Sequence, residues 1–177
     1  MSWSRRAVLL SGLAFVVTAC VEGGYQPVNA PGAAANALRQ GSLRIAAPSD
    51  EDGYHFVARL EQRFGQASRN PLFDLDYTLT VGEEPVGVRP DQATQRFNVI
   101  GRLDYRVSSV ATGAVLTSGG FESFSSYSAT DGAISGLSAQ ENAHQRLMIL
   151  LADQLVTRLN AGASTWAAPQ TKGARAQ

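Results

Sequence analysis

The sequence has 177 residues, 44% of them hydrophobic, and its 15 Lys and Arg side chains equal its 15 Asp and Glu side chains in number. This length suffices to bury one core, and the composition is the opposite of that of disordered or collagen-like chains. The lack of a basic excess argues against nucleic-acid binding. A single Cys and two His exclude a disulfide framework and leave little material for a metal site, so no cofactor is expected.

The N-terminal segment has the pattern of an export signal. Arg5 and Arg6 precede an apolar run over residues 7–17, as in secretory signal peptides. The run is shorter than the ~20 residues that a permanent transmembrane helix requires. We therefore expect residues 1–19 to be removed, which leaves the mature chain slightly acidic because both arginines are lost. The Arg pair also fits twin-arginine export, and the sequence leaves that route and the Sec route open.

The end of this segment, Val17-Thr18-Ala19-Cys20, resembles the bacterial lipobox, and Cys20 is the only cysteine of the chain. In lipobox chemistry the thiol is diacylated, the preceding bond is cut and the new amino group is acylated. Several acyl chains give stable membrane anchoring. Cys20 is therefore the predicted lipid attachment site, palmitate being one expected acyl group, and Val21 in place of Asp favours the outer membrane. The alternative is an ordinary signal peptide with a chance cysteine.

Residues 20–41 are rich in Gly, Ala, Pro and Asn without periodicity, which predicts an acylated tether before a folded domain at 42–161. The alternation over 42–46 predicts a short strand. The acidic residues 50–52 offer an N-cap and charges that suit the start of a helix. That helix is expected to run through Phe64 and to close at Gly65.

Three long strands are expected next, at 72–81, 94–110 and 115–127, each with apolar residues on one side. Residues 82–93 are predicted to form a loop. Residues 111–114 are predicted to form a tight hairpin turn, and Gly119-Gly120 a bulge in the third strand.

The last predicted element is a long helix. A loop is expected over 128–136, and Ser138 with Glu141 fits a capping box at the helix start. A stripe of Ala and Leu residues, including Leu150, continues to Ala161, where Gly162 would end the helix. Residues 162–177 are predicted to be a flexible tail with Trp166 as its one large anchor.

These elements predict an α+β fold of order β-α-β-β-β-α, with both helices packed on one face of a four-stranded mixed sheet. This arrangement buries every apolar stripe and leaves an arginine-bearing sheet face in water.

No catalytic motif accompanies the polar residues. The serines over 123–128 lack the Gly-x-Ser-x-Gly nucleophile elbow. His55 and His144 are interpreted as surface or boundary side chains. The chain is therefore predicted not to be an enzyme.

Four arginines are the candidate binding residues. Arg96, Arg102 and Arg106 fall on one side of a predicted strand, and Arg89 lies in the loop before it. Guanidinium groups pair with phosphate or carboxylate. They therefore mark either a site for an anionic lipid or protein partner, or a solvated face that nearby aspartates neutralise.

Several different short motifs are spread along the whole mature chain. The first is Gly24-Tyr25-Gln26-Pro27-Val28, and the others are Asp76-Tyr77-Thr78-Leu79-Thr80, Thr94-Gln95-Arg96-Phe97, Leu103-Asp104-Tyr105-Arg106-Val107, Ala111-Thr112-Gly113, Ser125-Ser126-Tyr127 and Leu151-Ala152-Asp153-Gln154-Leu155. In this order they resemble the lipopolysaccharide (LPS)-assembly lipoproteins of the LptE family. The opening differs from the family's Gly-Phe-x-Pro-Leu by Tyr for Phe and Val for Leu.

The resemblance implies a non-catalytic lipoprotein, lipid-anchored at the periplasmic side of the outer membrane. Its implied partners are the LptD β-barrel, which it plugs and helps to assemble, and LPS, which it helps to deliver to the outer leaflet. Two alternatives remain: an auxiliary lipoprotein of an inner-membrane lipid transporter, and a lipid-anchored exported hydrolase.

Overall fold

Three long strands, one short strand and two helices make up the computed structural model, which describes residues 38–86, 95–129 and 133–167. The elements are β1 (Leu43–Ile45), α1 (Glu51–Phe64), β2 (Phe73–Val86), β3 (Gln95–Ser109), β4 (Val115–Ala129) and α2 (Ala133–Trp166). The strands lie side by side in the order β1-β2-β3-β4. β1 runs parallel to β2, and the other neighbours are antiparallel.

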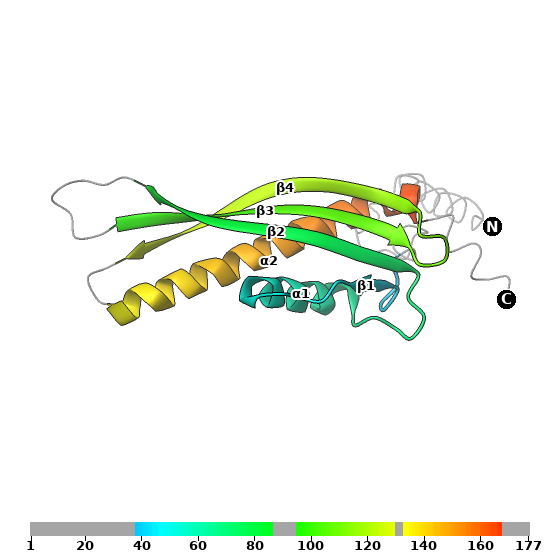
Figure 1. Cartoon of the computed structure of the whole chain (residues 1–177), viewed down its shortest axis with the longest axis horizontal. Coiled ribbons are helices and arrows are strands. Elements are labelled where there is room, and N and C mark those ends of the chain that lie inside the picture. Colours follow the sequence, from blue (N-terminus) through cyan, green and yellow to red (C-terminus); the bar gives the residue numbers. More distant parts are fainter. Residues whose placement is uncertain (1–37, 87–94, 130–132, 168–177) are drawn as a thin grey trace, which may run out of the picture. The chain divides into compact units, whose positions relative to one another are not determined.

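Both helices lie on the same face of the sheet (Figure 1). This confirms the predicted α+β fold with a mixed four-stranded sheet. The core lies between the two layers and consists of alternate strand residues and one stripe from each helix. Its largest fully buried side chains are Leu43, Phe56, Leu60, Phe73, Leu75, Val99, Leu103, Leu147, Met148, Leu151, Leu155 and Leu159. Neither α1 nor α2 covers the opposite sheet face.

The ends of α1 follow from its sequence. The Asp50 carboxylate accepts a hydrogen bond of 2.7 Å from the Gly53 amide, which is the predicted N-cap. Gly65 ends the helix with a φ of 77°, and its amide donates to the Glu61 carbonyl. Glycine adopts this left-handed conformation without the steric cost that a Cβ imposes.

β2 continues five residues past its predicted end and includes Gly82 and Pro85. Pairing with β3 extends to Val86, which lies opposite Arg96. Proline is tolerated on an edge strand, and β1 pairs only with the first three residues of β2. The predicted loop at 82–93 therefore begins too early, and residues 87–94 lie outside the described part.

The irregularity between β3 and β4 lies at Val107 and Ser108, so the predicted bulge at Gly119-Gly120 is wrong. Both glycines keep the regular register. A Cβ on Gly119 would lie 3.0 Å from the Tyr105 hydroxyl, and one on Gly120 would collide with the Asp104 carboxylate. The glycines make room for bulky residues on β3.

α2 has 34 residues and exceeds its predicted bounds at both ends. Ser138 lies inside the helix, so the capping box does not start it, and Gly162 does not end it. The last turns stay helical because they are packed, with Ala163 and Trp166 buried. Leu150, which was assigned to the buried stripe, is 44% exposed. In the described ranges, no helix is both long and apolar enough to cross a membrane.

Candidate functional site

The three candidate binding arginines on β3 lie on one face of the sheet. Arg96, Arg102 and Arg106 occupy alternate positions on the strand and are exposed, on the face opposite the helices. The alternation therefore placed them correctly. Cys20 and Arg89 lie outside the described residues.

The sheet face opposite the helices, which we call the open sheet face, carries charges of both signs. Arg102 donates to Asp104 over 3.1 and 3.4 Å, which raises the pKa of its guanidinium. At the β1 edge, Arg44 makes two hydrogen bonds to Asp74, of 2.6 and 2.8 Å. Asp76 lies opposite Arg106 in the register. These carboxylates compete with any outside anion, so the face is not a basic patch.

Among the described residues, two of the three arginines are left without an ion-pair partner and can bind an outside anion. Neither Arg96 nor Arg106 forms an ion pair or side-chain hydrogen bond with another described residue. Arg96 lies near one end of the sheet, opposite Val86 and Ser128. On the described residues, these two are better placed than Arg102 to meet an anionic group.

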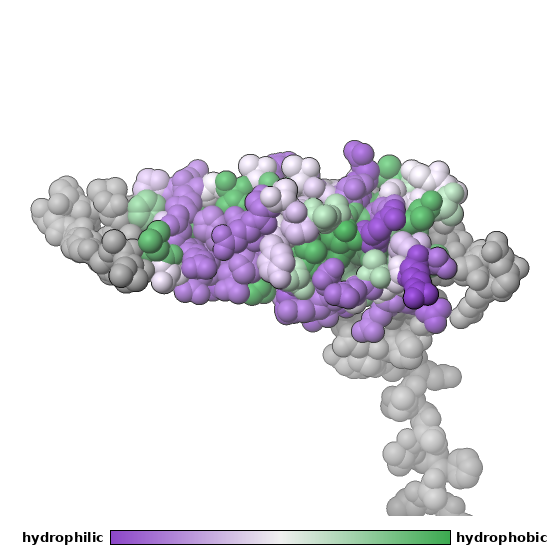
Figure 2. Space-filling model, turned by 60° about the horizontal axis from the view of Figure 1, so that its bottom comes forward, coloured by the Kyte–Doolittle hydropathy of each residue, from purple (hydrophilic) through white to green (hydrophobic). Residues whose placement is uncertain are grey.

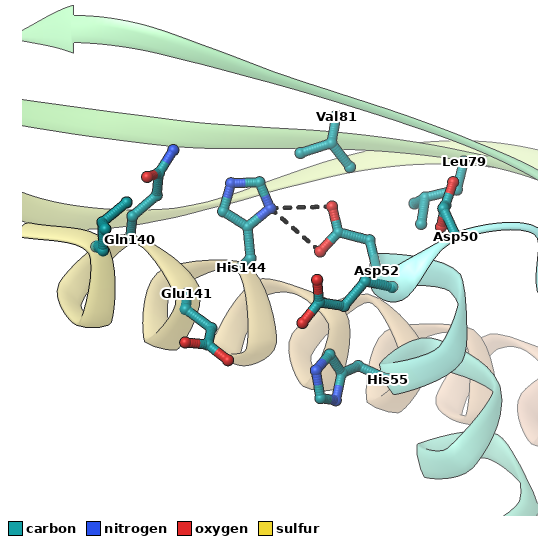
Figure 3. A pocket seen from close by; sticks show the side chains of 10 residues that line it. Asp50, Asp52, His55, Leu79, Val81, Gln140, Glu141 and His144 are labelled. Carbon is teal, nitrogen blue, oxygen red and sulfur yellow. Dashed lines mark hydrogen bonds and ion pairs between the residues drawn. The ribbon is translucent and has the colours of Figure 1, made fainter.

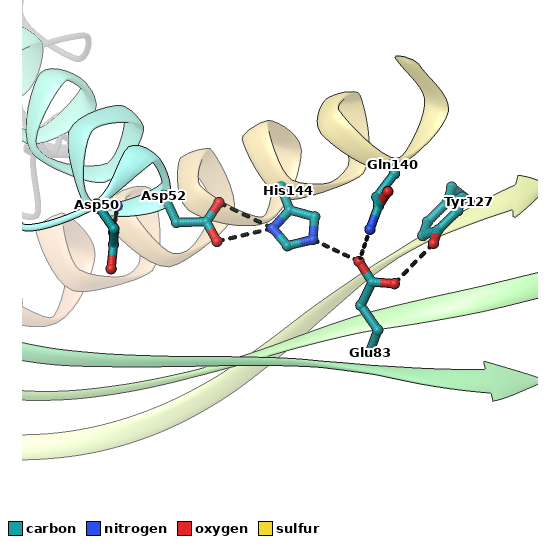
Figure 4. Close-up of polar contacts among 7 residues, drawn as sticks. Asp50, Asp52, Glu83, Tyr127, Gln140 and His144 are labelled. Atoms are coloured by element: carbon teal, nitrogen blue, oxygen red, sulfur yellow. Dashed lines mark hydrogen bonds and ion pairs between the residues drawn. The ribbon is translucent and has the colours of Figure 1, made fainter. Parts of the chain in front are cut away.

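A second polar cluster lies on the helical side and joins four elements (Figure 4). The Nδ1 atom of His144 lies 2.9 and 3.1 Å from the Asp52 carboxylate oxygens, and its Nε2 lies 2.9 Å from Glu83. Glu83 also accepts hydrogen bonds of 2.7 Å from Gln140 and 2.9 Å from Tyr127. We call these five residues the His144 cluster.

Both ring nitrogens of His144 face carboxylates, which the protonated imidazolium satisfies by donating from each. Burial opposes that charge, but the hydrogen bonds to Glu83 and Asp52 outweigh it, and the pKa of His144 is raised. Burial alone would raise the pKa of Glu83, but the hydrogen bonds that it accepts from His144, Gln140 and Tyr127 lower it. Burial and then the Glu83 carboxylate raise the pKa of Tyr127 to about 12.

Sequence reasoning missed this cluster because it ended β2 at Val81. In the structure the alternate side chains of β2 that face the helices include Leu79, Val81 and Glu83. Glu83 therefore lies beneath α2. The sequence after Val81, Gly-Glu-Glu-Pro-Val, does not continue the apolar alternation, so it gave no signal that the strand would extend to Glu83. No sequence pattern indicated that Asp52, far away in the chain, would meet His144.

Beside the cluster lies a groove of about 710 Å³ between the start of α1, the first half of α2 and β2 (Figure 3). Its lining residues are Asp50, Glu51, Asp52, His55, Leu79, Val81, Leu137, Gln140, Glu141 and His144. We call it the α1–α2 groove. The helical side of the domain is largely hydrophilic with separate hydrophobic patches (Figure 2). Within the described ranges, no three His, Cys, Asp or Glu side chains are arranged to hold a metal ion.

The fold and the family comparisons agree on the class of protein, an α+β lipoprotein domain. The model of the LptE family, described as lipopolysaccharide-assembly, matches residues 40–159. The chain therefore belongs to the LptE family of LPS-assembly lipoproteins. A comparison with curated protein sequences gave no match.

Solved structures share the fold at low identity. A Caulobacter crescentus chain described as a lipoprotein is 19% identical, with a TM-score of 0.62 over 76% of this chain and 99% of that chain. Rare lipoprotein B from Shewanella oneidensis is 16% identical, with a TM-score of 0.52 over 70% and 95%. A minor lipoprotein from Acinetobacter baumannii is 13% identical, with a TM-score of 0.50 over 68% and 91%.

Proposed function

We propose that this protein is a non-catalytic lipoprotein of the outer membrane that plugs an LptD-type β-barrel, assists its assembly and helps to deliver LPS to the outer leaflet. The observation that carries the proposal is the family match, which covers all four strands, α1 and most of α2. The lumen of an outer-membrane barrel is polar. A domain that enters it must itself present a polar surface.

The open sheet face has the character that such a plug requires. It alternates arginines with carboxylates and small hydroxyl side chains, and the helices leave it uncovered. Charges of both signs can pair with the mixed polar wall of a lumen without the self-repulsion of a single-sign patch. This face is the proposed barrel-contacting surface.

Membrane attachment is proposed at Cys20, through acylation of its thiol and new amino group. The N-terminal lipid would hold the domain at the periplasmic side of the outer membrane. LPS contacts are proposed at Arg89, Arg96, Arg102 and Arg106. Among them Arg96 and Arg106 are favoured, because Arg102 is already paired with Asp104.

A pull-down from the native envelope in mild detergent tests the partner. The C-terminally tagged chain is expected to retain a large outer-membrane β-barrel in near-stoichiometric amount. Recovery of an inner-membrane transporter in its place would support an auxiliary transport lipoprotein. Recovery of no partner would contradict the plug and reopen the question of an exported hydrolase.

The LPS contact is tested by charge reversal. Arg96→Glu is expected to weaken binding of purified LPS while the circular dichroism spectrum stays unchanged. Arg69→Glu is the matched control, since Arg69 is also exposed and unpaired among the described residues but lies in the turn region after α1. Equal binding by both variants and the unsubstituted chain would remove Arg96 from the site.

A further inference from the structure

The α1–α2 groove exists because α1 is shorter than the sheet it covers. The start of α1 lies at Tyr77, whose ring is 5.0 Å from that of Phe56, and a Cβ on Gly53 would lie 3.4 Å from the Tyr77 hydroxyl. β2 continues past this point, so Leu79 and Val81 are left only half-buried. They form an apolar floor, to which Leu137 of α2, 67% exposed, adds a further apolar side chain.

The groove is strongly acidic. Four of its lining residues are carboxylates and none is Lys or Arg. Asp50 is occupied as the N-cap of α1, and Asp52 is bound to His144. Glu51 of α1 and Glu141 of α2, from opposite sides of the groove, form no hydrogen bond or ion pair with any described residue.

This combination excludes one class of occupant and favours another. Phosphate groups, including those of LPS, would be repelled by unpaired carboxylates in a partly enclosed site. A cationic side chain would pair with them, and adjacent apolar side chains would cover Leu79 and Val81. A volume of about 710 Å³ is within the range of roughly 300–1,000 Å³ typical of ligand sites. That space suits a few side chains of a peptide segment.

We propose that the α1–α2 groove is a docking site for a segment of the barrel partner that carries Lys or Arg next to apolar residues. The inference rests on the proposed function, since it needs a protein partner at this face. It adds a second contact surface, on the side of the domain opposite the open sheet face. Glu51 and Glu141 pair with the basic side chain, and the half-buried floor of β2 receives its apolar neighbours.

Site-specific photo-crosslinking in the native envelope tests the location. A photoreactive phenylalanine analogue replaces Leu137 in the groove or, as the matched control, Tyr54 of α1, which lies outside both the groove and the open sheet face and is 64% exposed against 67% for Leu137. The Leu137 position is expected to crosslink to a Lys- or Arg-containing segment of the co-purifying barrel. A Leu137 crosslink to LPS, to a second copy or to the chain's own termini would overturn the proposal.

Charge reversal tests the chemistry. Glu51→Lys with Glu141→Lys is expected to abolish the Leu137 crosslink and to reduce barrel recovery at least tenfold. The control, Glu61→Lys, reverses a carboxylate of α1 that lies in neither the groove nor the open sheet face and is expected to leave the Leu137 crosslink and barrel recovery intact. Barrel recovery with an unchanged Leu137 crosslink in the groove variant would overturn docking while leaving the plug intact. Failure of the unsubstituted chain to recover any barrel would overturn the proposed function and this inference together.

Discussion

The indole of Trp166 stands edge-on to the ring of Phe73, with the ring centroids 5.3 Å apart and the planes at 80°. Trp166 is the last residue of α2 and Phe73 is the first of β2. This contact packs the end of α2 against the start of β2. It explains why the helix does not end at Gly162, where the sequence suggested a stop.

Replacement of Trp166 by Ala should therefore destabilise the domain. Trp166 is only 8% exposed, and loss of a buried aromatic side chain typically costs about 3–5 kcal/mol. We expect the free energy of unfolding, measured by urea denaturation, to fall by about 3 kcal/mol. The exposed neighbour Ser164→Ala is the control. Equal stability of the two variants would show that the last turn of α2 is dispensable.

Gly101 is expected to resist substitution because α2 packs closely on it. A Cβ at this position would lie 2.9 Å from the Leu151 Cδ1 atom and 3.0 Å from the Leu147 Cδ2 atom. Gly101→Val should cost about 1–3 kcal/mol through overpacking. Gly82→Val on the neighbouring strand has nothing within 4 Å of its Cβ, so thermal unfolding should show little loss. A stable Gly101→Val variant would contradict the close helix–sheet approach.

The His144 cluster should make stability depend on pH. The pKa of His144 is raised above its ordinary 6.5, so its stabilising effect is complete below pH 6.5 and is lost as pH rises through the raised value. His144→Ala should cost about 1–2 kcal/mol at about pH 5.5 and less at about pH 8.5. Urea denaturation at both pH values measures this. His55→Ala is the control, and a cost that grows with pH would contradict the ion-paired imidazolium.

In acid, the stability contributed by the His144 cluster should depend on pH in the opposite direction. The pKa of Glu83 is lowered below its ordinary 4.5, so its stabilising effect is present above pH 4.5 and is lost as pH falls through the lowered value. Tyr127→Phe removes one of the donors to Glu83, which should move that loss to higher pH. Carbon-detected NMR titration of the Glu83 carboxyl group measures the shift directly. Tyr54→Phe, at an exposed ring, should leave the Glu83 titration unchanged.

Local chemistry was enough to predict the fold class and several boundaries. Asp50 and Gly65 delimit α1 through their own cap geometry. Gly113, with a φ of 68°, makes the predicted hairpin turn. The two-residue alternation placed Arg96, Arg102 and Arg106 on one face. These features depend on residues a few positions apart, whose preferences the sequence displays directly.

The sequence by itself therefore determined the element order, the buried stripes and the side of the strand on which the candidate arginines lie. The tertiary structure alone decided where α2 and β2 end, which arginine is neutralised, and that His144 meets Asp52 and Glu83. The physical reason is range. Caps and periodicity act within a turn or a strand, whereas the ends of α2 and the His144 cluster depend on contacts between distant segments, whose packing overrides local propensity.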